Sequence, residues 1–192
     1  MYLGWVPDDG FLRPYAERAI SQLDCIRPEA IDTFISIVIR LWNSDPRDYY
    51  WRREVETLTP DELVTLGIDK WARTPRMLID CLSQKGLTAP EEAFAASVRY
   101  VRTAIHLDIE YDRCLENTLG KKRGLPFFAA VLVSTRDECC AEGKRLSGRL
   151  FGGRNLPKLP LPNCSPERCR CSYRSITKRE VERKLAEGYR WA

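Results

Sequence analysis

Thiol groups dominate the chemistry that this sequence could support. The chain has 192 residues and 8 cysteines, and five of these cysteines lie between residues 139 and 171. Two are adjacent, Cys139 and Cys140, and three follow in the segment Cys164-Ser-Pro-Glu-Arg-Cys169-Arg-Cys171. We expect no secretory signal, because Met1–Val6 lacks both a basic start and a full apolar stretch. In a reducing compartment such a cluster is more often a metal site than a set of disulfides.

Cys164, Cys169 and Cys171 can converge on one ion if the backbone between them forms a tight turn, which Pro166 favours. A fourth ligand must then come from elsewhere in the chain. Four thiolates suit tetrahedral Zn²⁺ or an iron–sulfur cluster, and the spacing does not separate the two. One alternative is that these cysteines are buried free thiols. Another is a redox pair or disulfide, and the adjacent Cys139 and Cys140 would be the reactive pair of a thiol redox sensor.

Several motifs follow one another in the last third of the chain: a strand, a cysteine, a glycine turn, a proline run and a cysteine knuckle. They are Phe128–Val133, Cys140, Gly148-Arg-Leu-Phe151, Leu159-Pro-Leu-Pro162 and Cys164–Tyr173. In this combination the segment resembles a cysteine-containing module of small uncharacterised bacterial proteins. The resemblance implies a structural module and no particular activity.

This resemblance also implies which residue is the fourth ligand. Its register matches Cys140, and not Cys139, to the helix cysteine of the module. The implied ligand set is Cys140, Cys164, Cys169 and Cys171. The module usually continues after its tyrosine with a histidine-containing stretch, which this chain replaces with Arg174-Ser-Ile-Thr.

The net charge of +4 conceals two halves of opposite sign. Residues 121–192 carry 17 Lys and Arg against 7 Asp and Glu, a balance of +10, and the first 120 residues therefore carry −6. The run Gly120-Lys-Lys-Arg-Gly124 marks the change and predicts a boundary between an acidic helical domain, 1–120, and a basic cysteine-rich module, 121–192. Either the two halves attract each other within the fold, or the basic module faces an acidic protein or nucleic acid. The residues expected to contact such a partner are Lys121, Lys122, Arg123, Lys178, Arg179, Arg183 and Lys184.

Helical periodicity covers most of the acidic half. Apolar residues recur at helical spacing over 29–42 and over 88–116. Thr59-Pro60-Asp61-Glu62 is a capping box that opens a short helix ending at Gly67, and Thr74-Pro75 opens another that closes at Gly86. The first half of the chain is therefore predicted to be a helical domain.

The basic half follows a different pattern. The short apolar run Phe127–Val133 predicts a buried strand. A helix is expected from Thr135 through Leu150, carrying Cys139 and Cys140 and ending at Gly152-Gly153, and Thr177 caps a final basic helix that reaches about Tyr189. The predicted fold class is mainly α, a helical N-terminal domain with a small α+β cysteine-clamped module.

These patterns favour a non-enzymatic, metal-stabilised interaction or adaptor protein. His106 is the only histidine and shares a helix face with Glu110 and Cys114, which could be a metal site or a Cys–His pair but is more simply a surface interaction. The chain contains no HExxH motif and no Gly-rich phosphate loop. The longest apolar stretch, 35–42, is too short to cross a bilayer, so we expect a cytoplasmic protein.

A nucleic-acid-binding regulator is the alternative function. The segment 60–87, together with the helix over 29–42, resembles a helix-turn-helix arrangement. In that arrangement Lys70, Arg73, Arg76 and Lys85 would face DNA. The surrounding half is acidic, which argues against a phosphate-binding face.

Overall fold

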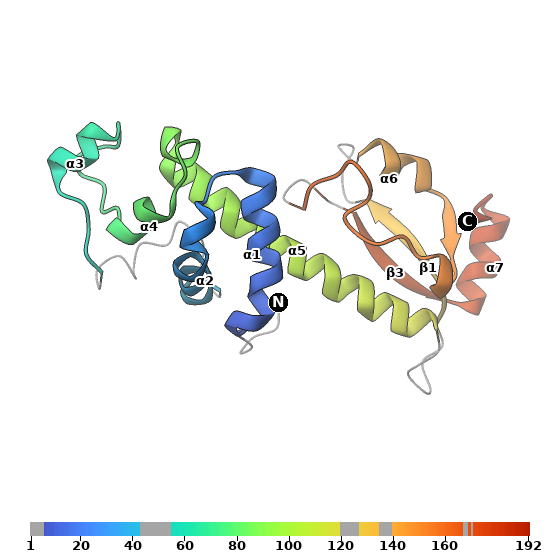
Figure 1. Cartoon of the computed structure of the whole chain (residues 1–192). Coiled ribbons are helices and arrows are strands. Elements are labelled where there is room, and N and C mark those ends of the chain that lie inside the picture. The colour runs from blue at the N-terminus through green and yellow to red at the C-terminus, as the bar shows by residue number, and fades with distance from the viewer. Residues whose placement is uncertain (1–5, 43–54, 120–126, 135–139, 167–168, 170) are drawn as a thin grey trace. The chain divides into compact units, whose positions relative to one another are not determined.

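The computed structural model describes residues 6–42, 55–119, 127–134, 140–166, 169 and 171–192 (Figure 1). The fold is mainly α, with an α+β part near the C-terminus, as the sequence predicts. Contacts divide the chain into two compact units, Met1–Arg102 and Thr103–Ala192. None of the described helices combines the length and the apolar character that crossing a bilayer requires.

The N-terminal unit is built from helices and short turns around a small apolar core. Its elements are α1 (Asp9–Leu23), η1 (Pro28–Ala30), α2 (Ile31–Arg40), α3 (Pro60–Thr65), α4 (Arg76–Cys81), η3 (Gly86–Thr88) and the first part of α5 (Pro90–Thr118). Phe34 of α2 and Phe94 of α5 are fully buried and meet edge to face, with ring centroids 6.0 Å apart. Such aromatic pairs stabilise a core beyond the area that they bury.

Helix α2 and the capped helix α3 confirm the predictions for 29–42 and 59–67. Helix α1, which contains Pro14, has no counterpart among the predicted helices. Asp8 caps it by accepting a hydrogen bond from Phe11 N at 2.8 Å. The prediction that the helix opened at Thr74-Pro75 runs to Gly86 is wrong. Helix α4 ends at Cys81 because Leu82 is extended and forms a β-bridge with Ile26.

The C-terminal unit combines a four-stranded sheet with short helices and the second half of α5. Its other elements are β1 (Phe127–Ser134), α6 (Ala141–Leu146), β2 (Arg149–Phe151), η4 (Gly153–Asn155), β3 (Cys171–Thr177), α7 (Lys178–Ala186) and β4 (Arg190–Trp191). The strand order is β3-β1-β2-β4. Strand β1 is antiparallel to both β2 and β3, and β2 is parallel to β4.

Each face of this sheet packs against a different helix. On one face Ala130, Leu132 and Phe151 share an apolar cluster with Leu107 and Tyr111 of α5. A second cluster, on the other face, contains Ala129, Val131, Leu150 and Ile176 of the sheet together with Val181 of α7. This division follows from the alternation of side chains along a strand. Figure 1 shows α7 beside the sheet.

The prediction of one helix from Thr135 to Leu150 is wrong. Helix α6 begins only at Ala141, with Cys140 as its extended N-cap, and it ends at Leu146. Gly148 has a φ of 77°, which turns the chain into β2, and Leu150 lies in that strand. The capping box at Thr135–Glu138 and Cys139 lie outside the described residues. Strand β1 and the Thr177-capped helix α7 agree with the sequence.

The division between the units falls at Arg102/Thr103, inside α5, whereas the charge pattern places the boundary at residue 120. The reason is packing, because Leu107, Tyr111, Cys114 and Leu115 of α5 belong to the apolar cluster of the C-terminal sheet. A charge reversal marks where composition changes, but a compact unit is defined by the apolar contacts of its core.

Candidate functional site

The four cysteines of the predicted ligand set border one apolar cluster of the C-terminal unit. Cys169 and Cys171 are buried within it, at 4% and 3% exposure, and Cys140 and Cys164 pack against it half-buried. None of the four forms a disulfide with another described cysteine. The sequence therefore identifies a group of cysteines that the fold brings into one region.

Each thiol of this group is positioned by a local backbone feature. The Sγ of Cys140 accepts a hydrogen bond from Gly143 N at 3.3 Å, as the N-cap of α6. Cys169 N donates to Ser165 O at 2.9 Å and to Pro166 O at 3.2 Å, which is the tight turn that the proline favours. Cys171 is the first residue of β3.

Three of the four thiols are close enough for two of them to affect the pKa of the third. The pKa of Cys164 is raised to about 12, first by burial and then by the neighbouring Cys169 and Cys140. A deprotonated Cys164 would therefore be stabilised by a nearby cation. However, within the described residues no group of three or more His, Cys, Asp or Glu side chains is arranged to hold a metal ion. The metal site stays a prediction.

Two tyrosines contact the segment that leads into the cysteine turn, but only Tyr173 makes a short hydrogen bond to it. Tyr173 on β3 donates its hydroxyl to Pro157 O at 2.6 Å, and its ring meets Phe151 edge to face with centroids 6.1 Å apart. Tyr111 on α5 donates to Leu156 O at 3.4 Å. Burial raises the pKa of Tyr173 well above its usual value, so the hydroxyl keeps the proton that it donates.

The structure does not bring His106 and Cys114 together as a Cys–His pair. His106 is exposed, and its Nε2 lies 3.8 Å from Glu110 Oε1. Cys114 is buried, its Sγ lies 3.3 Å from Ser175 Oγ, and burial raises its pKa. A buried thiol with a raised pKa is a poor nucleophile.

The cations of the C-terminal unit fall into two groups. One group is paired with acidic residues of the same unit: Arg113, Arg145, Arg174, Arg183 and Lys184 with glutamates, and Lys158 with Asp108. A second group is exposed and has no acidic partner among the described residues: Lys144, Arg149, Arg154, Lys178, Arg179 and Arg190. The predicted contact residues Lys178 and Arg179 belong to this second group, whereas Arg183 and Lys184 do not. Lys121, Lys122 and Arg123 lie outside the described residues.

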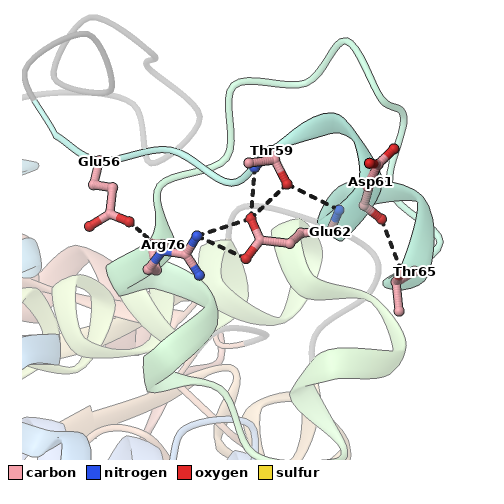
Figure 2. A network of polar contacts seen from close by, with 6 residues as sticks. All are labelled: Glu56, Thr59, Asp61, Glu62, Thr65 and Arg76. Carbon is pink, nitrogen blue, oxygen red and sulfur yellow. Dashed lines mark hydrogen bonds and ion pairs between the residues drawn. The ribbon is translucent and has the colours of Figure 1, made fainter.

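Arg76, one of the four cations that would face DNA in the helix-turn-helix arrangement, is already paired with two glutamates (Figure 2). Arg76 donates to Glu56 Oε1 at 2.6 Å and to both carboxylate oxygens of Glu62 at 2.9 Å. Glu62 also completes the capping box with Thr59, and the backbone N–H of Thr59 is the main reason that its pKa falls to about 2. Helices α3 and α4 have only six residues each. These contacts stabilise a helix start rather than present a cation to phosphate.

No family model, curated protein or solved structure matches this chain. The sequence indicates the thiols and the α7 cations, but it does not reveal the hydrogen bond from Tyr173 to Pro157 O or the pairing of Arg149 with Arg190. Strand β4 has two residues, too few for a sequence pattern to reveal it.

Proposed function

We propose that this protein is a non-enzymatic, metal-stabilised adaptor whose basic C-terminal module docks an acidic partner. The observation that carries the proposal is the placement of Lys178 and Arg179 in the first turn of α7, where both are exposed and neither has an acidic partner in the described structure. Cations at a helix N-terminus oppose the helix dipole and destabilise the helix. Unpaired charges that weaken their own helix are better explained by binding than by folding.

The neighbouring cations of the same helix differ in this respect. Lys184 Nζ lies 2.7 Å from Glu187 Oε2 and also over the Tyr189 ring, and Arg183 Nε lies 3.7 Å from Glu187 Oε1. Both stand in the last turn, where cations favour the helix dipole. Arg183 and Lys184 therefore support the fold, and the docking role is assigned to Lys178 and Arg179.

The comparison between these two pairs tests the proposal directly. We would measure binding of a fluorescent deca-glutamate peptide at low salt for the wild type and for two double variants of equal charge change. Lys178→Gln/Arg179→Gln is expected to weaken binding about fivefold or more, because two unpaired cations are removed from the contact. The control Arg183→Gln/Lys184→Gln is expected to change affinity less than about twofold, since these charges are already paired.

Two results would contradict the docking proposal. The docking proposal is wrong if the wild-type protein fails to bind the peptide at low salt. Binding of single-stranded or duplex DNA with a steep salt dependence, and no binding of the peptide, would instead support the nucleic-acid-binding regulator. The engaged state of Arg76 in α4 favours the first function over the second.

The metal clamp is the structural part of the proposal. Its support is the gathering of Cys140, Cys164, Cys169 and Cys171 at one cluster, and the soft thiolate donors suit Zn²⁺ or an iron–sulfur cluster. Elemental analysis of protein purified without added metal should find zinc or iron. Less than about 0.2 equivalents, together with unchanged stability of Cys169→Ser, would remove the clamp and leave free buried thiols.

A further inference from the structure

Two arginines stand in register on neighbouring strands of the C-terminal sheet. Strands β2 and β4 are parallel, and Arg149 pairs directly with Arg190. Registered residues of adjacent strands project from the same face, with backbones about 4.8 Å apart. Both side chains are exposed. The two guanidinium groups therefore start from adjacent positions at one edge of the sheet.

The backbone fixes this pair while the charges stay unmatched. Arg190 N donates to Gly148 O at 3.1 Å, and Ala192 N donates to Leu150 O at 3.0 Å, so β4 is held along β2. Like charges directly opposite each other on a sheet are destabilising. Neither arginine has an acidic partner in the described part of the chain, although several neighbouring cations do. An anion bound between the two arginines would relieve this repulsion.

The side of the sheet on which the pair lies follows from the alternation of β2. Leu150 belongs to the apolar cluster that contains Val181 of α7, and Phe151 belongs to the cluster of α5 and the cysteines. Because successive side chains alternate, Arg149 projects on the same face as Phe151. Arg190 projects on this face as well, because it is in register with Arg149. The pair thus shares a face with the thiol cluster.

We propose that Arg149 and Arg190 form an anion-binding pair that receives a carboxylate side chain from an acidic segment of a partner protein. This inference rests on the proposed docking function and adds a contact point on the face of the sheet opposite α7. A guanidinium presents a planar fork of N–H donors, and a carboxylate has two oxygens that can accept from two forks at once. The two arginines occupy a single register position on β2 and β4. Such a local pair of forks matches one carboxylate, whereas a phosphate backbone is bound by cations repeated along its length.

Single and double variants test the pair against a matched control. Arg149→Gln, Arg190→Gln, the double variant and the control Arg154→Gln would be compared for binding of the deca-glutamate peptide. Arg154 is also exposed and without an acidic partner in the described structure, but it has no registered neighbour. Each single variant is expected to weaken binding about fivefold, and the control less than about twofold. The double variant should be little worse than either single variant, because both arginines hold one carboxylate.

Thermal unfolding without peptide gives a second readout. Removing one of two repelling charges should leave the melting temperature unchanged or raised, whereas an arginine needed for folding would lower it. Two results would refute the proposal that Arg149 and Arg190 bind one carboxylate together. One is an equal loss of binding in all variants including Arg154→Gln, and the other is a strictly additive loss in the double variant. The proposal would also be refuted if single-stranded DNA or inorganic phosphate displaced the labelled peptide at a lower concentration than unlabelled deca-glutamate does.

The outcome also separates this inference from the docking function on which it rests. If Lys178→Gln/Arg179→Gln weakens peptide binding while the Arg149 and Arg190 variants bind as the wild type does, the anion pair is wrong and the docking function stands. If the wild type does not bind the peptide at low salt, both fail together.

Discussion

Replacing Tyr173 with phenylalanine removes one hydroxyl from the support of the cysteine segment. The ring and its contact with Phe151 are retained, so the change isolates the hydrogen bond from Tyr173 to Pro157 O. Its length of 2.6 Å lies within the ordinary range for O–H···O bonds. Tyr173 is only 6% exposed, so water replaces the lost donor poorly.

The expected cost of Tyr173→Phe is about 1–1.5 kcal/mol, the net contribution of a well-formed bond whose acceptor is left partly buried. For a chain of this size, that corresponds to a fall in melting temperature of about 2–6 °C. Urea unfolding followed by circular dichroism would measure the free energy, and calorimetry would measure the temperature. The midpoint should shift without a change in the urea dependence, because the packing is preserved.

Tyr111→Phe is the matched control. Its hydroxyl donates to the adjacent carbonyl of Leu156, but at 3.4 Å the bond is too long to contribute much. We expect a cost below about 0.5 kcal/mol. A Tyr111→Phe variant that loses as much stability as Tyr173→Phe, or a Tyr173→Phe variant that loses none, would refute the assignment of Tyr173 as the support of this segment.

Two further predictions concern the helix starts and one close backbone approach. The pKa values of Glu62 and Glu180 are lowered from 4.5 to about 2, first by hydrogen bonds from the backbone N–H groups of Thr59 and Thr177. The two ionised carboxylates therefore stabilise the fold fully above pH 4.5, and this stabilisation is lost as the pH falls towards 2. Glu62→Gln/Glu180→Gln should therefore flatten the acid side of the stability–pH curve, and an unchanged curve would contradict this. A Cβ at Gly86 would collide with the Cys25 carbonyl oxygen, so Gly86→Ala should lower the free energy of unfolding in urea by about 2 kcal/mol or more. The control is Gly10→Ala in α1, where the Cβ meets only Asp8 Oδ1 at 3.5 Å, and it should not destabilise the protein.

Local signals in the sequence predict the helices well where a cap and an apolar face coincide. The Thr59 and Thr177 capping boxes are both present with their reciprocal bonds. Strand β1 is predicted because its apolar run is too short for a helix and is rich in valine at its end. These features depend on neighbours within four residues, which a sequence displays directly.

Features set by distant partners could not be read in the same way. Leu82 ends α4 because it bridges Ile26, and Leu150 lies in β2 because it pairs with Val131. The pairing of Arg149 with Arg190 depends on β4, whose two residues are placed by the turn after α7. Tertiary pairing overrides local propensity at such positions.

The position of Cys140 changes how the metal prediction should be tested. On the predicted helix the side chains of Cys139 and Cys140 would point about 100° apart. In the structure Cys140 is instead the N-cap of α6, and its Sγ accepts a hydrogen bond from Gly143 N. Serine is a preferred N-cap, so Cys140→Ser keeps the cap and removes only the soft ligand. We therefore expect lower metal content with nearly unchanged stability of the metal-free protein, while Cys25→Ser in the N-terminal unit keeps the metal. Full metal content in Cys140→Ser would exclude Cys140 from the ligand set and leave the fourth ligand to Cys139 or another donor.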